Sequence, residues 1–216
     1  MILDSNQLWI AKQEELITEF KNQPLIVLIR IPNHELEQVK FSNTINLIKS
    51  LIKYRIHNIE IAWSSHPKWE FAMQKIKDKF PGIPLGIASI RCPNGISSMR
   101  RLGCIYGMSP VWDSQMQYIA KEAGQILIPG VFTPSEIQKA INFGWKMIKL
   151  FPASLLGHNY LNLFKYPIRD LPFVIGAGGL KVSDIKLFLK SGFGAIIIGK
   201  DILKTSTIEL SQLNLN

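Results

Sequence analysis

The sequence has few cysteines and no long apolar run, and each of these absences excludes a class of protein. Only Cys92 and Cys104 occur among 216 residues, which excludes a disulfide framework and a cysteine-based metal cluster. No apolar run reaches the roughly 20 residues that a transmembrane helix needs, and residues 1–21 lack the apolar core of a signal peptide. We therefore expect a cytoplasmic protein that has no membrane partner.

A dense run of basic residues is also missing, although the chain is basic overall. It has 25 Lys and Arg residues against 16 Asp and Glu residues, a formal net charge of +9. Because these cations are scattered, nucleic acid is a weaker candidate partner than a small anion such as a carboxylate or a phosphate. Hydrophobic residues make up 47% of the sequence and charged residues 19%, as in globular proteins. We expect one domain over residues 1–216.

Repeating apolar segments predict the secondary structure. Gly82, Gly103, Gly124 and Gly144 each precede a short apolar segment, at spacings of 21, 21 and 20 residues. Such a period is typical of a repeated strand-and-helix unit. An amphipathic helix is expected over 4–20, with further helices over 35–54 and 67–80 and after Lys204. Eight strands are expected, at 24–30, 58–63, 84–89, 104–109, 125–129, 147–151, 173–176 and 195–199.

Eight strands alternating with helices indicate an α/β fold, a (β/α)8 TIM barrel with an N-terminal helix. The alternative is an open doubly wound sheet, which would carry a Gly-x-Gly-x-x-Gly motif after its first strand. The first strand is followed instead by Ile31-Pro32-Asn33. The barrel is therefore favoured, and in that fold the active site lies at the carboxyl ends of the strands.

One amine, Lys149, lies among apolar residues in the sixth of these strands. Lysine is rarely fully buried without a partner, and burial lowers its pKa because it removes the water that stabilises the charged form. A neutral amine can attack a ketone and form a Schiff base. The alternative is a lysine of the barrel wall whose head group reaches solvent or pairs with a carboxylate.

Further polar groups end other strands and should meet Lys149 at the same mouth. Glu60 is expected on the inward face of its strand, where it could transfer protons or serve only as the salt-bridge partner of Lys149. The residues alone leave these two roles of Glu60 open. The other candidates, which would contact a substrate, are Arg30, Ser89, Pro110, Phe151, Gly178, Gly179 and Asp201.

Two segments resemble a known family. Residues 148–153, Ile-Lys-Leu-Phe-Pro-Ala, resemble the Lys-Phe-Phe-Pro-Ala segment of the 2-keto-3-deoxy-6-phosphogluconate and 4-hydroxy-2-oxoglutarate aldolases. Residues 128–136 are similar to that family's Ile-Pro-Gly-x-x-Thr-x-x-Glu, and shorter matches are Met108-Ser109-Pro110 and Gly178-Gly179. The likeness extends from about Pro24 to about Leu203.

The resemblance implies a class I aldolase that is a homotrimer and uses neither a metal nor a cofactor. Lys149 would form an imine with pyruvate, and Glu60 would transfer protons. The implied reaction is the reversible cleavage of a 2-keto-4-hydroxy acid, such as either family substrate, to pyruvate and an aldehyde. Two alternatives remain: a family member that has lost catalysis and binds a small anion, and a phosphosugar isomerase or synthase that binds phosphate at Gly178-Gly179.

Two of the departures from the family pattern replace groups that hold the substrate. The arginine that helps to hold the substrate carboxylate is replaced by Ser64, and a hydroxyl does not replace a bidentate guanidinium in kind. Arg91, just beyond the third strand, could substitute for it. The serine of the phosphate cradle is replaced by Asp201, whose charge repels a phosphate. Since neighbouring strand residues face opposite ways, we expect Lys200 to point out of the mouth if Asp201 points in. A weak preference for phosphorylated substrates follows.

Overall fold

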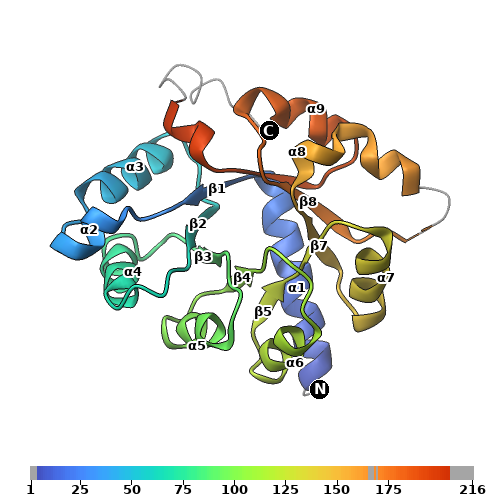
Figure 1. Cartoon of the computed structure of the whole chain (residues 1–216), viewed down its shortest axis with the longest axis horizontal. Coiled ribbons are helices and arrows are strands. Elements are labelled where there is room, and N and C mark those ends of the chain that lie inside the picture. Colours follow the sequence, from blue (N-terminus) through green and yellow to red (C-terminus); the bar gives the residue numbers. More distant parts are fainter. Residues whose placement is uncertain (1–3, 165–167, 169, 205–216) are drawn as a thin grey trace.

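The computed structural model describes residues 4–164, 168 and 170–204 of the chain. Within this part, nine parallel strands form one sheet in the order β5-β4-β3-β2-β1-β9-β8-β7-β6, with helices between them (Figure 1). The strands are β1 (Leu25–Ile29), β2 (Ile59–Ala62), β3 (Leu85–Ala88), β4 (Tyr106–Met108), β5 (Ile126–Ile128), β6 (Gly130–Val131), β7 (Met147–Leu150), β8 (Phe173–Ala177) and β9 (Ala195–Ile198).

The two ends of this sheet are joined by one residue, Pro129. β5 pairs with β4 and β6 pairs with β7, so the expected fifth strand is divided between its two neighbours. Proline has no N–H group for a sheet ladder, but its carbonyl still accepts a hydrogen bond from the Lys149 N–H at 2.9 Å. The sheet is thus a nearly closed barrel, and the predicted (β/α)8 fold is confirmed.

The helices surround the barrel as a ring (Figure 1). They are α2 (Asn33–Gln38), α3 (Ser42–Lys53), α4 (Trp69–Lys79), α5 (Pro93–Arg101), α6 (Ser114–Glu122), α7 (Pro134–Phe143), α8 (Ala153–Leu156) and α9 (Ile185–Lys190), with the 3-10 helices η1 (His158–Phe164), η2 (Val182–Asp184) and η3 (Lys200–Lys204). The helix expected after Lys204 lies outside the described residues. No helix in the described part of the chain is both long enough and apolar enough to cross a membrane.

The helix expected over 35–54 is interrupted. Val39 takes a left-handed conformation with φ of 54°, which a β-branched residue rarely adopts, and it separates α2 from α3. The buried carboxylate of Glu35 stabilises this break, because it accepts hydrogen bonds from the Asn43 N–H at 2.8 Å and the Thr44 hydroxyl at 2.6 Å. Glu35 therefore caps the N-terminus of the following helix.

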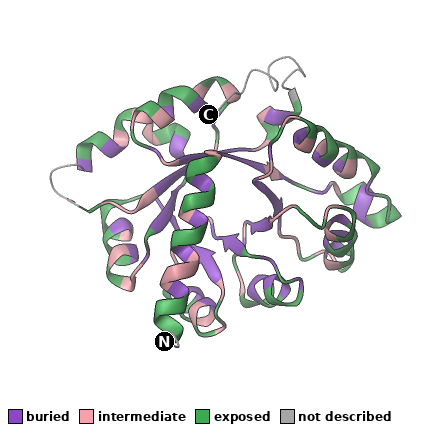
Figure 2. Ribbon diagram, turned by 180° about the vertical axis from the view of Figure 1, so that it is seen from behind, coloured by how far each residue is buried: buried purple, intermediate pink, exposed green. Residues whose placement is uncertain are grey.

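The predicted N-terminal helix, α1 (Ser5–Asn22), covers the amino ends of the strands. Its first turn is fixed by a capping box between Asp4 and Gln7. The carbonyl oxygen of the Gln13 side chain accepts the Lys146 N–H at 2.9 Å, just before β7. Figure 2, the view from behind, shows α1 lying across the barrel. This helix leaves the carboxyl ends open on the opposite face, and its buried side chains are Trp9, Gln13, Leu16 and Phe20.

Candidate active site

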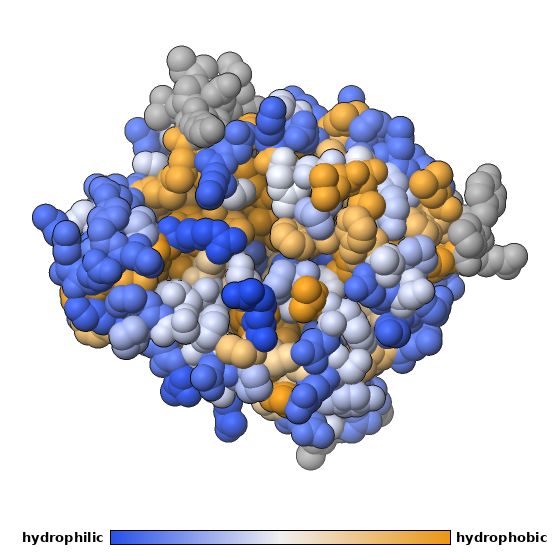
Figure 3. All heavy atoms as spheres, in the orientation of Figure 1, coloured by the Kyte–Doolittle hydropathy of each residue, from blue (hydrophilic) through white to orange (hydrophobic). Residues whose placement is uncertain are grey.

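A cavity of about 470 Å³ lies at the carboxyl ends of the strands. All nine residues singled out from the sequence line it: Lys149, Glu60, Arg30, Ser89, Pro110, Phe151, Gly178, Gly179 and Asp201. The fold therefore brings the predicted residues together from seven strands or strand exits. Figure 3 shows hydrophilic and hydrophobic side chains next to one another around the centre of this face. A second cavity between β1, α3 and η3 is mostly apolar and contains neither Lys149 nor Glu60.

The amine of Lys149 is held inside the barrel by the strand that carries it. β7 pairs with β6 on one side and β8 on the other, and only 5% of the Lys149 surface is exposed. The pKa of this amine is lowered to about 8, chiefly by burial; the charge of Glu60 opposes the shift and the charge of Arg30 adds to it. The Lys149 Nζ atom lies 5.6 Å from the centre of the Phe151 ring, two residues along the chain. The neutral, nucleophilic form of the amine is thus more accessible near physiological pH than it is in an ordinary lysine.

Glu60 is the buried acid of the same cavity. Its side chain is 1% exposed, and burial raises its pKa to about 7, although the charge of Lys149 acts in the opposite direction. Among the described residues no ion pair joins Glu60 to Lys149. The two charges nevertheless act on one another, because each shifts the pKa of the other group. A carboxyl group with a pKa near neutrality is suited to both accepting and donating a proton.

The rim of the cavity has an unusual backbone. Gly178 and Gly179 have φ angles of 90° and 73°, which favour glycine. A Cβ atom on Gly178 would also lie 2.7 Å from the Phe151 ring, so glycine is needed there for the ring to pack. Ser89 adopts a φ of 62° without being glycine. Such left-handed conformations in non-glycine residues often occur at functional sites.

Asp201 and Lys200 both belong to the cavity lining, and the expectation that they face opposite ways assumed that they continue a strand. Lys200–Lys204 is a 3-10 helix and not a strand, so the alternation of strand side chains does not apply. The Asp201 carboxylate accepts a hydrogen bond from the Val182 N–H at 2.9 Å. It thus binds the backbone N–H of the first residue of η2, the short 3-10 helix beyond the β8 exit. In TIM barrels, the loops after the last two strands frequently provide the phosphate-binding N–H groups.

The family model for aldolases, described as KDPG and KHG aldolase, matches residues 17–215. The chain belongs to this family. The two abbreviations denote the keto acids that the sequence resemblance implied, so both the predicted family and the predicted aldolase class, a lyase, are confirmed. The family match favours the aldolase over an anion-binding protein without catalysis and over a phosphosugar isomerase or synthase.

Individual relatives of this aldolase are distant. The 2-dehydro-3-deoxy-6-phosphogalactonate aldolase of Escherichia coli (strain K12) is 25% identical over 147 residues, which cover 68% of this chain and 71% of that protein. The 2-dehydro-3-deoxy-phosphogluconate aldolase of Pseudomonas aeruginosa is 25% identical over 119 residues, which cover 55% of this chain and only 54% of that protein. A KDPG aldolase structure from Legionella pneumophila, with pyruvate captured as a covalent carbinolamine intermediate, has a TM-score of 0.75 at 19% identity and covers 91% of this chain and 95% of that chain. This structural likeness shows a shared fold.

Ser64, after β2, and Arg91, after β3, are the two positions considered above for binding of the substrate carboxylate. Neither residue lines the cavity of this aldolase. The Ser64 hydroxyl accepts the His66 N–H at 3.1 Å and so stabilises a local turn. Arg91 is exposed and also lies outside the cavity lining. Of the cations that line the cavity, Arg30 is the one whose charge acts on Lys149.

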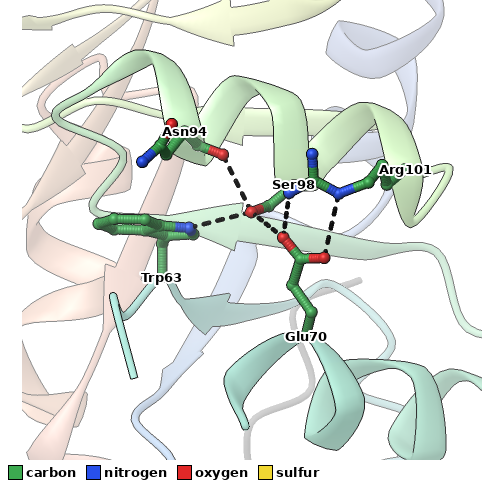
Figure 4. A network of polar contacts seen from close by, with 5 residues as sticks. All are labelled: Trp63, Glu70, Asn94, Ser98 and Arg101. Carbon is green, nitrogen blue, oxygen red and sulfur yellow. Dashed lines mark hydrogen bonds and ion pairs between the residues drawn. The ribbon is translucent and has the colours of Figure 1, made fainter. Parts of the chain in front are cut away.

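Trp63, the residue before Ser64, belongs to a network of polar contacts with two helices. The Trp63 indole N–H donates to the Ser98 hydroxyl at 3.3 Å, and that hydroxyl lies 2.5 Å from a Glu70 oxygen (Figure 4). Arg101 forms an ion pair with the same carboxylate. These contacts tie α4 to α5 and hold Trp63 against the outer helices. Trp63, which follows β2, therefore takes part in a network with a structural role.

The structure adds cavity residues that sequence reasoning missed. The cation Lys181 and the apolar side chains Leu28 and Ile197 line the cavity beside the predicted set. Strand alternation could have identified Leu28, which is two residues before Arg30. Lys181 lies in a loop and carries no such signal. In the described part of the chain no group of three or more His, Cys, Asp or Glu residues is arranged to hold a metal ion.

Proposed function

We propose that this chain is a class I aldolase that cleaves a 2-keto-4-hydroxy acid through an imine on Lys149. The observation that carries the proposal is a buried amine, with a pKa lowered to about 8, facing a buried carboxyl group in the cavity of a (β/α)8 barrel. In support, a structure of a family member holds pyruvate as a covalent carbinolamine. Trapping the imine, described at the end of the Discussion, tests the proposal.

In the proposed reaction, the neutral Lys149 amine attacks the 2-keto carbon, and loss of water from the carbinolamine gives a protonated imine. Removal of the proton from the C4 hydroxyl breaks the C3–C4 bond, and the electron pair moves into the imine to form an enamine. The aldehyde then leaves. Protonation of the enamine at C3 and hydrolysis of the imine release pyruvate. The iminium serves as the electron sink, so the proposal includes no metal or cofactor.

Glu60 and the rim residues have separate roles in this proposal. Glu60 accepts the hydroxyl proton, directly or through a water molecule, and returns a proton to C3. Arg30 binds the substrate carboxylate in place of the missing family arginine, because its charge lies close enough to Lys149 to lower the pKa of that amine. Ser89, Pro110, Phe151, Gly178 and Gly179 form the surface against which the substrate packs.

The preferred substrate is a short keto acid without a phosphate. Asp201 already binds the Val182 N–H, and its carboxylate places a negative charge in the cavity wall. Two like charges about 4 Å apart repel by ~1 kcal/mol in water and by several kcal/mol where partly desolvated. Lys200 and Lys181 line the same wall, and their charges reduce this repulsion. They do not free the Val182 N–H, which Asp201 occupies.

Replacing Asp201 by serine is therefore expected to raise the ratio of kcat/KM for the phosphorylated six-carbon substrate to that for 4-hydroxy-2-oxoglutarate by about tenfold or more. The matched control is Asp184→Ser, since the Asp184 carboxylate accepts the neighbouring Lys181 N–H at 2.8 Å but does not line the cavity. That control should leave the ratio unchanged. A clear preference of the unmutated protein for the phosphorylated substrate would contradict the assignment.

We also propose that the protein is a homotrimer in the cytoplasm. Large apolar side chains are exposed beyond neighbouring strands: Val111 after β4, Phe132 after β6 and Leu155 in α8. Tyr160 of η1 donates to the Phe132 carbonyl at 2.9 Å, and η1 lies against α8, so Phe132 and Leu155 belong to one region of the surface. Contiguous exposed apolar surface is typical of subunit interfaces. Light scattering should give three times the chain mass of 24.5 kDa, and a monomeric mass would contradict the trimer.

A further inference from the structure

Tyr106, the first residue of β4, lies in the barrel interior and lines a cavity between α1 and the amino ends of the strands, not the active-site cavity. Its side chain is buried, and Phe20 of α1 packs edge-on against its ring with the ring centres 5.3 Å apart. Neither the sequence motifs nor the proposed reaction gives this tyrosine a role. A phenylalanine would fill the same volume, so the hydroxyl group is the feature to explain.

The strand register brings this hydroxyl group toward Glu60. Glu60 pairs with Gly86 of β3, and Ile87 pairs with Gly107, so that Gly86 lies opposite Tyr106. Residues paired across parallel strands point to the same face of the sheet, which is here the barrel interior. A Cβ atom on Gly86 would lie 2.7 Å from the Tyr106 hydroxyl oxygen. The ring thus lies across Gly86 with its hydroxyl directed toward β2.

Two buried oxygen atoms in this region lack a hydrogen-bond partner among the described residues. They are the Tyr106 hydroxyl oxygen and Oε1 of Glu60. Buried polar groups in native proteins are almost always satisfied by protein or by ordered water, and leaving one unsatisfied is costly. A phenol can donate and a carboxylate can accept, so these two groups are complementary.

The surrounding charges keep the phenol in its donating form. Burial raises the pKa of Tyr106 well above its usual value, and the nearby Glu60, Cys104 and Glu19 add to the effect. The charge of Lys149, on β7, also acts on Glu60, and the charge of Arg30, at the β1 exit, acts on that lysine. Tyr106 thus offers Oε1 of Glu60 a candidate donor that carries no charge.

We propose that Tyr106 is a positioning residue for Glu60, with its hydroxyl group donating to Oε1 through one buried water molecule. This contact orients the carboxylate so that Oε2 faces the substrate and Lys149. The inference rests on the proposed role of Glu60 in proton transfer. Tyr106 does not touch the substrate, and it acts only through Glu60.

The test is Tyr106→Phe, measured by exchange of the pyruvate methyl protons with deuterated water over a range of pH. Loss of a donor to the carboxylate disfavours its charged form, so the acidic limb of the profile should move to higher pH. The kcat value for cleavage should fall by about tenfold to a hundredfold, the effect of one hydrogen bond to a charged group, with KM nearly unchanged. Borohydride trapping of the pyruvate imine should persist.

Two comparisons separate this inference from a structural role. Tyr118→Phe removes an exposed hydroxyl group on the outer surface and should change nothing. In a Glu60→Gln background, Tyr106→Phe should have no further effect on exchange, because both changes act on one group. An unshifted pH profile for Tyr106→Phe, in a protein that still forms the imine, would overturn this inference but not the proposed function. Failure of the unmutated protein to form an imine would instead overturn the proposed function.

Discussion

Replacing Lys149 by alanine or arginine is expected to lower kcat for aldol cleavage by about 10⁴-fold or more while the barrel remains folded. Alanine removes the nucleophile. Arginine keeps the positive charge, but its guanidinium stays protonated at all accessible pH values and cannot form the imine. Cleavage is followed by the release of pyruvate, and circular dichroism checks that each variant is folded.

The controls for Lys149 are the other lysines nearest in sequence or in space. Lys146→Ala removes an exposed amine three residues earlier, at the amino end of the barrel, and should leave kcat unchanged. Lys200→Ala removes an amine that lines the cavity, and imine formation should persist in this variant. Cleavage at the unmutated rate in Lys149→Ala would show that another amine is the nucleophile.

Glu60→Gln is expected to slow the exchange of pyruvate methyl protons with deuterated water by about 10²–10⁴-fold, the usual effect of a positioned acid–base group. The amide has nearly the same shape as the carboxyl group but cannot take up the proton at C3. Imine formation depends on the neutral amine, so trapping with borohydride should be partly retained. Nuclear magnetic resonance of the methyl signal measures the exchange.

A matched control for Glu60 is Glu35→Gln, which alters a second buried carboxylate far from the reaction. Glu35 caps α3 through Asn43 and Thr44 and does not line the cavity. Its replacement should lower thermal stability by the loss of a cap, about 1 kcal/mol, without slowing exchange in the folded protein. Exchange at the unmutated speed in Glu60→Gln would reduce Glu60 to a charge partner of Lys149.

The barrel could be predicted because its strands are short, apolar and regularly spaced. The division of the fifth strand at Pro129 could not, since it depends on which neighbour each half pairs with. The break at Val39 was also missed, because the sequence there is helical in pattern and the Glu35 cap acts over eight or nine residues. The local sequence pattern therefore predicted which helices and strands exist better than it predicted where each one begins and ends.

The candidate site residues could be predicted to lie together because a barrel brings all its strand ends to one mouth. That rule placed residues such as Lys149, Glu60 and Arg30 without any knowledge of contacts. Side-chain alternation did not apply to Lys200 and Asp201, because the chain leaves the strand there and forms a 3-10 helix. The strand-end rule gave no indication of Tyr106, which begins its strand and approaches Glu60 only because the intervening Gly86 has no side chain.

The most direct measurement is incubation of the unmutated protein with pyruvate and borohydride, followed by intact-mass analysis and peptide mapping. Reduction of the imine increases the mass of the chain by that of one pyruvic acid molecule less one oxygen atom. We predict a single adduct per chain, on the peptide that contains Lys149, and its yield should rise with pH as the amine, with its pKa near 8, loses its proton. No adduct, or an adduct on Lys181 or Lys200, would contradict the assignment of Lys149 as the Schiff-base residue.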